Sequence, residues 1–150
     1  TSTTAVYGSN SKREINEKYL AQLKYADIYL DTFIYNAATT ASNALWMGIP
    51  VITKMGKSYT ARMASSLLKS IDLPELITTS PEDYEKLALE LATNPEKLKN
   101  IKKKLEINRI TKPLFDTKKF TRHFENGLKQ VFKNYMDGNK PQNILVKEDI

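Results

Sequence analysis

The sequence predicts an α/β fold, a Rossmann-like parallel sheet flanked by helices. Short runs of β-branched and aliphatic residues alternate with longer segments in which apolar residues recur at helical spacing. Three strands are expected, at residues 28–30, 50–53 and 76–78. Strands that are joined through a helix almost always pair in parallel, which gives the predicted sheet its direction.

Length and composition restrict the class of protein. The chain has 150 residues, enough for one domain with a sizeable core, and its opening on Thr1 rather than Met leads us to expect a longer parent protein. With no cysteine and a single histidine, neither disulfides nor a structural zinc site is expected. No run approaches the roughly 20 apolar residues of a membrane span, and no signal peptide pattern is present. We therefore expect a cytoplasmic, metal-free protein without a membrane partner.

The first elements are a brief strand and a helix. Residues 5–7 suggest the strand, and a helix is plausible from Ser11 or Lys12 to about Tyr25. An apolar stripe at helical spacing supports this helix and includes Tyr19. By this pattern alone, Tyr19 is a packing residue.

Residues 27–53 are predicted to form a strand–helix–strand unit. After the strand at 28–30, Thr39 or Thr40 can cap a helix that runs to Trp46. Gly48 suits the positive φ of a helix C-terminus, and Pro50 blocks continuation of the helix.

The loop before this helix is the candidate binding site. Ligands of open parallel sheets lie beyond the carboxyl ends of the strands. The first amides of a helix have no partner within it, and the helix dipole places about half a positive charge there. The backbone at residues 39–42, with the two threonine hydroxyls, can therefore hold a phosphate. The alternative is that Thr39 or Thr40 merely caps a structural helix.

Gly56-Lys57-Ser58 resembles the end of a nucleotide-binding P-loop. That motif requires another glycine five residues before Gly56, where this chain has Val51. We instead predict that Ser58 caps a helix with an apolar stripe of Tyr59, Met63 and Leu67, whose small residues Ala61, Ala64 and Ser65 pack on the sheet. Arg62, in its first turn, either reaches an anion or is simply exposed.

Three later helices carry clear start signals. Each begins with a predicted N-cap residue that precedes a segment with inward apolar positions: Ser80, Asn94, and either Asp116 or Thr117. A proline follows each of the first two caps. The helix over 116–138 has a long apolar and aromatic stripe, which is predicted to pack on the core. His123 lies beside the stripe and is predicted to be structural rather than a catalytic base. The net charge of +6 arises mostly between Lys97 and Lys133, where a solvated helix face is favoured over a nucleic-acid site.

Several motifs in order resemble one enzyme family. The segment LDTFIYNAATTASNALWMGIPVIT is followed by GKSYTARMASSLL, LPELI, PLFDTKKFTRHFE and YMDGNKP. Together they are similar to the C-terminal catalytic lobe of the protein O-linked N-acetylglucosamine transferases, more narrowly to the bacterial SPINDLY-like branch. The resemblance runs from about Glu14 to Pro141.

The resemblance implies specific site residues. Thr39 and Thr40 match threonines placed against the donor diphosphate. Asn43 occupies the position of an Asp that bonds the ribose, and its amide oxygen can still accept, without charge assistance. Ala38 stands where many members have His, beside the diphosphate, and supplies no side-chain donor. Tyr19 falls where a His commonly lies near the donor, and Gln22 falls on a common Arg position.

The resemblance also implies architecture and partners. It predicts the C-terminal lobe of a glycosyltransferase-B architecture that is incomplete at its N-terminus, with a nucleotide-sugar-binding lobe over 1–141 and a tail over 142–150. The donor would be UDP-N-acetylglucosamine, bound without metal or cofactor, and the acceptors would be Ser or Thr of proteins. The N-terminal lobe and the helical repeats would lie upstream, so no catalytic residue is assigned here and the 150 residues should not catalyse transfer alone. In the resembled family the terminal helix also helps to hold the two lobes together, which implies that part of the stripe over 116–138 is a docking surface.

Two other functions remain open. Because Ala38 and Asn43 depart from the pattern, the lobe could be catalytically degenerate and serve as a scaffold or protein-interaction module. The basic helix leaves a weaker third reading, a nucleic-acid-binding domain.

Overall fold

A computed structural model of the chain describes residues 16–146. The chain divides into two compact units, one up to Lys112 and one from Pro113 onward, and each is described by itself. The strand predicted at 5–7 and the helix start predicted at residue 11 or 12 lie outside the described residues.

The first unit is built on a parallel sheet of three strands in the order β1-β2-β3. These are β1 (Tyr29–Leu30), β2 (Val51–Lys54) and β3 (Ile77–Thr78). Tyr29 pairs with Val51 across β1 and β2, and Lys54 pairs with Thr78 across β2 and β3. The predicted α/β class, the parallel direction and all three strands are confirmed.

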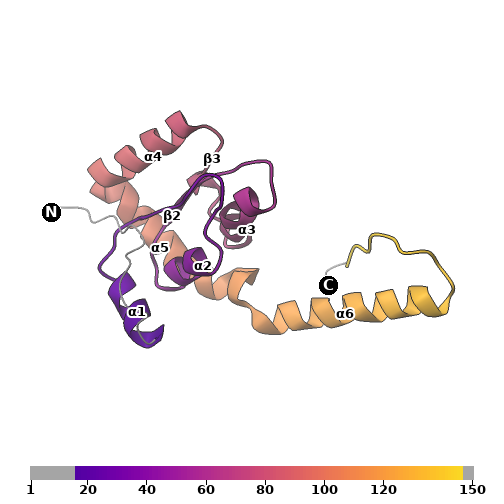
Figure 1. The fold of residues 1–150 in the computed structure, drawn as a ribbon. Coiled ribbons are helices and arrows are strands. Elements are labelled where there is room, and N and C mark those ends of the chain that lie inside the picture. Colours follow the sequence, from indigo (N-terminus) through magenta and orange to yellow (C-terminus); the bar gives the residue numbers. More distant parts are fainter. Residues whose placement is uncertain (1–15, 147–150) are drawn as a thin grey trace. The chain divides into compact units, whose positions relative to one another are not determined.

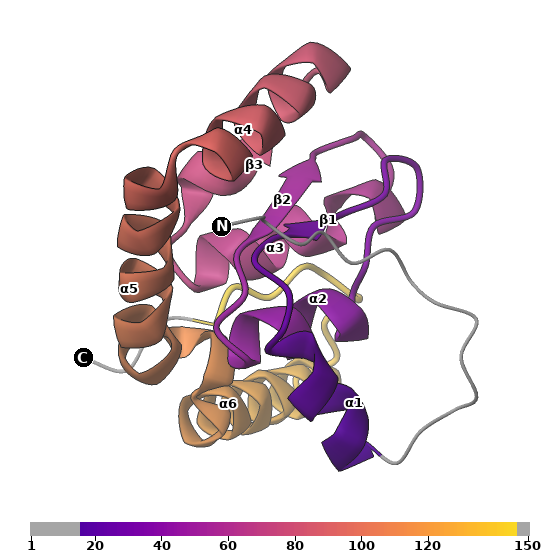
Figure 2. The same ribbon diagram turned by 90° about the vertical axis from the view of Figure 1, so that its left-hand side faces the viewer.

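Five helices belong to this unit. They are α1 (Asn16–Leu23), α2 (Thr39–Trp46), α3 (Met63–Ser70), α4 (Pro81–Thr93) and α5 (Pro95–Thr111), with short 3-10 turns at Thr60–Arg62 and Pro74–Leu76. Figures 1 and 2 show α2 and α3 on one side of the sheet and α4 on the other. The sheet is therefore covered on both faces, as a buried parallel sheet requires.

The core forms where these layers meet. Its largest fully buried side chains are aliphatic and come from all layers: Leu45, Ile52, Leu68, Ile71, Leu73, Leu76, Leu91 and Leu105. Leu98 and Ile101 of α5 also point inward, as predicted. Burial of each such side chain stabilises the fold by about 1.5–3 kcal/mol relative to exposure.

The predicted starts of α4 and α5 are confirmed by their caps. The Ser80 side chain accepts from the Asp83 amide, and the Asn94 side chain accepts from the Lys97 amide. Pro81 and Pro95 occupy the first helical positions, where a missing N–H leaves no bond unmade.

The predicted capping role of Thr39 or Thr40 is wrong. Ala38 occupies the N-cap of α2 without any side-chain cap bond, and Thr39 is the first helical residue. The cause is the preceding loop, in which the Ala37 amide already donates to Asp31, so the chain enters the helix before either threonine can act as a cap.

The start of the helix predicted from Ser58 is also wrong. The Ser58 hydroxyl accepts from the Ala61 amide at 3.2 Å and closes a 3-10 turn, so α3 begins only at Met63. The tighter turn changes the helical phase. Tyr59 is consequently 79% exposed, while the predicted small residues Ala61 and Ala64 are buried.

The second unit consists of a 3-10 turn at Pro113–Phe115, helix α6 (Thr117–Met136) and the chain that follows it. Asp116 caps α6 by accepting from the Lys119 amide at 2.9 Å, as predicted. The predicted stripe is exposed along its length, and Phe120 and Phe124 stack on each other at 6.0 Å between ring centroids. Whether the stripe is a docking surface, and whether the lobe extends over 1–141 with a tail over 142–150, stay predictions.

Candidate functional site

The candidate site is the N-terminus of α2, which follows the carboxyl end of β1. Thr39 and Thr40 are exposed there, and Ala37 and Ala38 before them are half-buried. The Ser42 amide is the first that bonds within the helix, donating to the Ala38 carbonyl at 2.9 Å. Within residues 16–146, nothing accepts from the amides of Thr39, Thr40 and Ala41. These three N–H groups form the donor set predicted for a phosphate.

A hydroxyl contact orients one of the threonines. The Tyr29 phenol on β1 donates to Oγ1 of Thr40 at 3.2 Å. Because the Thr40 oxygen accepts this proton, the threonine's own proton is free to point to another acceptor. From the sequence, Tyr29 was predicted only as part of the strand over 28–30, and its contact with Thr40 was not predicted.

Tyr19 from α1 is brought to the same cluster. Burial raises the pKa of the Tyr19 phenol above its ordinary value, and the neighbouring Tyr29 phenol raises this pKa further. Tyr19 and Thr40, which come from different helices, therefore both lie near Tyr29. Gln22, one turn after Tyr19, is exposed.

The other two predicted residues lie on or beside α2. Asn43 is half-buried one turn after Thr39 and Thr40, and its backbone carbonyl accepts from the Met47 amide. Ala38 presents only a methyl group at the helix start. The predicted residues of this set therefore lie together, but whether they bind a donor stays a prediction.

The loop that leads into α2 is organised by Asp31. This residue follows β1 and is only 4% exposed. Its Oδ1 accepts from the amides of Thr32 at 2.8 Å and Ala37 at 2.7 Å, and its Oδ2 accepts from the Thr53 hydroxyl at 2.7 Å. Burial raises the pKa of the Asp31 carboxyl, and the three hydrogen bonds oppose that rise.

This role of Asp31 was not predicted from the sequence. A signal was present, because the strand register that pairs Leu30 with Ile52 makes Asp31 and Thr53 neighbours. An acidic residue and a hydroxyl at adjacent positions of two buried strands are natural hydrogen-bond partners.

The same loop has further supports. Asn36 is fully buried, donates from its side chain to the Thr32 carbonyl at 2.7 Å and from its backbone to the Thr60 carbonyl at 3.1 Å. Phe33 meets Tyr84 edge-on at 4.9 Å between centroids, and the Lys54 ammonium lies 5.3 Å from the centre of the Phe33 ring. The loop is thus fixed to β2, to α4 and to the turn before α3.

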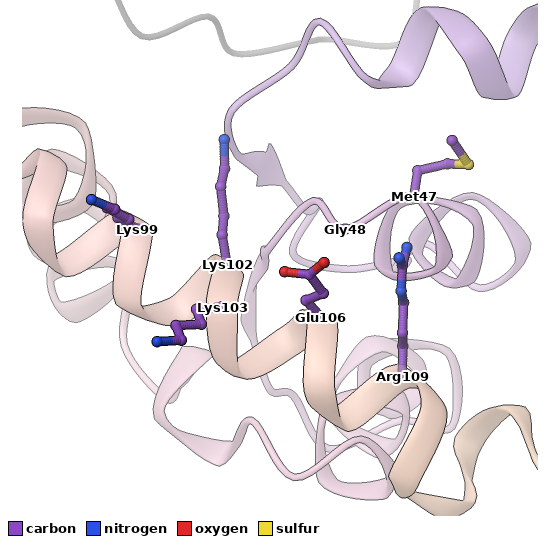
Figure 3. A pocket seen from close by; sticks show the side chains of 7 residues that line it. All are labelled: Met47, Gly48, Lys99, Lys102, Lys103, Glu106 and Arg109. Carbon is purple, nitrogen blue, oxygen red and sulfur yellow. The ribbon is translucent and has the colours of Figure 1, made fainter.

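A hollow of about 490 Å³ lies near the other end of α2 and is mostly basic. Figure 3 shows Glu106 and Arg109 of α5 pointing toward Gly48 and Met47, whereas Lys103 points away. Arg109 donates to the Trp46 carbonyl at 2.8 Å, and Lys102 pairs with Asp27 at 2.7 Å. The arginine here closes the C-terminus of α2, and the hollow gives no separate indication of a ligand.

The lysines of α5 mostly have structural partners. Lys97, Lys102 and Lys104 form ion pairs with acids of other elements, and Lys112 pairs with Asp72 just after the helix. This arrangement supports the reading of a solvated, ion-paired helix face.

Arg62 and His123 add nothing to the site. Arg62 is exposed at the N-cap of α3, and His123 is half-buried on α6 in the second unit. In the part of the chain that the structure describes, no group of three His, Asp or Glu side chains could hold a metal ion, and no helix is long and apolar enough to span a membrane. Metal independence of the predicted reaction stays a prediction.

Comparison with known proteins gives one consistent answer. Residues 8–124 match the family described as Glycosyl transferase family 41. The chain is 32% identical over 127 residues to a probable UDP-N-acetylglucosamine–peptide N-acetylglucosaminyltransferase SPINDLY of Hordeum vulgare, covering 85% of this chain and 14% of the relative. It is 33% identical over 136 residues to the corresponding SEC protein of Arabidopsis thaliana, covering 90% of this chain and 14% of the relative.

A solved structure agrees with the sequence relatives. A mutant O-GlcNAc transferase of Thermobaculum terrenum superposes with a TM-score of 0.76 at 30% identity, over 81% of this chain and 23% of that one. This likeness confirms the predicted lobe of a glycosyltransferase-B architecture. The chain spans about one seventh of the two curated relatives' length, that is 14%. The match over 8–124 and the agreement of fold show that the chain belongs to glycosyltransferase family 41.

Proposed function

We propose that this chain is the donor-binding part of a protein O-glycosyltransferase that transfers N-acetylglucosamine from its UDP-linked form to Ser or Thr of proteins. The two curated relatives are named as probable UDP-N-acetylglucosamine–peptide N-acetylglucosaminyltransferases, which supports the donor and the peptide acceptor. The proposal includes the acceptor proteins and the remaining lobe and helical repeats as partners of these residues.

The observation that carries the proposal is the bare N-terminus of α2. The helices α4, α5 and α6 each close their first turn with a side-chain cap, whereas α2 begins at Ala38 without one. Helix α3 also lacks a side-chain cap, but it continues directly from the 3-10 turn at Thr60–Arg62. Its three free amides lie at the carboxyl end of β1, where ligands of parallel sheets bind. An anion is the partner that satisfies such amides and the helix dipole together.

In this proposal the diphosphate of the donor accepts from the amides and hydroxyls of Thr39 and Thr40. Negative charge grows on the diphosphate as the sugar leaves, and fixed donors stabilise it without rearrangement. Tyr29 holds Thr40 ready to donate, and Tyr19 and Asn43 complete the wall toward the nucleoside. Ala38 contributes no donor, so binding depends on the backbone more than in relatives that have His there.

Calorimetric titration of the complete protein with UDP tests the proposal. We expect saturable binding, weakened at least about tenfold in a Thr39→Ala/Thr40→Ala variant, because hydrogen bonds to charged groups contribute about 1.5–3 kcal/mol each. The matched control is Thr93→Ala/Thr111→Ala, which removes two exposed helical hydroxyls that bond only to carbonyls of their own helices. This control should bind UDP as the wild type does.

The competing function is a degenerate lobe that serves as a scaffold. Ala38 and Asn43 favour it, since neither supplies the charged or strong hydrogen bond of the family pattern. A folded complete protein that binds no UDP and transfers no labelled N-acetylglucosamine to an acceptor protein would establish this alternative. Tight, strongly salt-dependent binding to random oligonucleotides would instead favour the basic helix as a nucleic-acid site.

A further inference from the structure

We propose that Asp31 is a positioning residue for the donor site, whose buried carboxylate fixes the loop over 32–38 and so aims the first amides of α2. The inference rests on the proposed function and deepens it. Asp31 itself touches no ligand in this proposal, because Thr32, Ala37 and Thr53 enclose its two oxygens.

The carboxylate closes the loop as a clamp. One oxygen, Oδ1, accepts from the amide at the start of the loop, Thr32, and from the amide near its end, Ala37. Ala37 directly precedes the N-cap residue of α2. Any change in the bond to Ala37 therefore moves the first turn of the helix, including Thr39 and Thr40.

The clamp is itself held from two sides of the fold. The other oxygen accepts from the hydroxyl of Thr53, which is fully buried in the central strand β2. The backbone carbonyl of Asp31 accepts from the Tyr84 phenol of α4 at 2.9 Å. Asp31 thus connects the start of the loop to both β2 and α4.

The chemistry of the clamp is unusual for a purely structural residue. No Lys or Arg forms an ion pair with Asp31 within the described residues, so a buried carboxylate is stabilised only by N–H and O–H donors. Burying a charge without an opposite charge is unfavourable, and apolar packing stabilises a strand end better. What the carboxylate supplies, and an apolar side chain does not, is a fixed acceptor for two amides at once.

Loss of the clamp should loosen the loop without unfolding the unit. Asn36 still connects the loop to the Thr32 and Thr60 carbonyls, and Phe33 still packs against Tyr84. The first turn of α2 would then sample several positions, and misplaced donors lose binding energy that depends on their preorganisation.

The test compares three variants of the complete protein. Asp31→Ala removes the clamp, whereas Asp31→Asn keeps an oxygen toward the two amides and turns an NH₂ group toward the Thr53 oxygen. Asn108→Ala is the matched control, since Asn108 is also buried and holds another turn by donating to the carbonyls of Ile71 and Asp72. UDP affinity is measured by calorimetry, and hydrogen–deuterium exchange is measured without ligand on the peptides that cover 32–46.

We expect Asp31→Ala to bind UDP at least about tenfold more weakly and to exchange faster over 32–46. Asp31→Asn should restore affinity to within about threefold, and Asn108→Ala should change neither quantity although it lowers stability. The inference is overturned if Asp31→Ala binds UDP as the wild type does, or if Asn108→Ala weakens binding equally. If the wild type binds no UDP, the proposed function fails, and the exchange data still decide whether Asp31 sets the loop.

Discussion

The N-termini of α2 and α4 differ in how their first amides and the positive end of the helix dipole are satisfied. At α4, the Ser80 hydroxyl accepts from the Asp83 amide at 3.1 Å, and two acids lie in the first turn. At α2, the N-cap is an alanine and the first turn holds no acid. The first arrangement satisfies the helix from within the chain, while the second leaves its positive end to a partner. Helix α3 also lacks a side-chain cap, but it continues from the 3-10 turn at Thr60–Arg62, whereas α2 begins directly after a loop. The missing cap is therefore informative at α2.

The two ends of α2 also differ: the C-terminus is closed by contacts within the chain, and the N-terminus is not. Its C-terminus is closed by Arg109, which donates to the Trp46 carbonyl, and by Gly48, whose φ of +83° allows the chain to turn back. A residue with a Cβ would be strained in that conformation. Only the end that faces the carboxyl edge of the sheet is open, which localises the proposed ligand to one turn.

The largest effect is expected when α2 is given the charge that α4 carries. In an Ala38→Asp variant the new carboxylate lies at the helix N-terminus, where the dipole stabilises it by about 0.3–1 kcal/mol. It also repels a diphosphate, so UDP affinity should fall at least about tenfold while the melting temperature stays the same or rises. Calorimetry and thermal unfolding of the same sample measure both.

The isosteric Ala38→Asn variant is the control for this charge. It should retain clearly more UDP affinity than Ala38→Asp, because it adds nearly the same volume without repulsion. Equal UDP binding by Ala38→Asp and the wild type would contradict an anion site at this helix.

The second largest effect is expected when the side-chain cap of α4 is removed. Ser80→Ala removes the cap, so the free energy of unfolding should fall by about 0.5–2 kcal/mol. UDP affinity should not change, since this cap stabilises only α4. Urea unfolding measures the loss, and a Ser80→Thr variant, which keeps the hydroxyl that accepts from the Asp83 amide and donates to the Asp83 carboxylate, should recover most of it.

Capped helices could be predicted from sequence because their signals are local. Each capping side chain accepts from an amide only three residues further along the chain, as at Ser80, Asn94 and Asp116. The strands at 28–30, 50–53 and 76–78 were predicted for the same reason, since burial of a short β-branched run depends on few neighbours.

The start of α2 could not be predicted in this way. Thr39 and Thr40 are good capping residues, yet the bond between Asp31 and Ala37 places the cap at Ala38. At α3, a glycine allows the loop to fold back, because a Cβ on Gly56 would lie 2.6 Å from that of Ala61. Both outcomes depend on contacts across a loop, which override local preference.

A smaller effect is expected at the closed end of α2. Arg109→Met removes the hydrogen bond to the Trp46 carbonyl but keeps most of the aliphatic packing, so unfolding free energy should fall by about 0.5–1.5 kcal/mol. UDP affinity should be unchanged, because the opposite helix end binds the ligand in our proposal. Urea unfolding measures the change in stability, and calorimetry measures UDP affinity. A clear loss of UDP binding would place the ligand in the basic hollow instead.

The smallest effect concerns the pH dependence of stability at Asp31. Burial raises its pKa in the folded state above the ordinary value of 3.8, so ionisation disfavours folding. As pH falls through the raised pKa toward 3.8, the wild type gains stability from protonation that Asp31→Asn cannot gain. The stability of Asp31→Asn relative to the wild type should therefore decrease over this window in urea titrations.

Asp72→Asn makes the same chemical change with the opposite expected slope. The hydrogen bond from Lys112, and the charge of that lysine, lower the pKa of Asp72, so its contribution to stability is present above pH 3.8 and is lost as pH falls through the lowered pKa. The stability of Asp72→Asn relative to the wild type should then increase toward acid pH. Asparagine tolerates the positive φ of 59° at this position, so the backbone does not confound the comparison. Parallel slopes for the two variants would show that Asp31 is stabilised as an ordinary surface carboxylate is, and would remove the reason to treat it as a buried clamp.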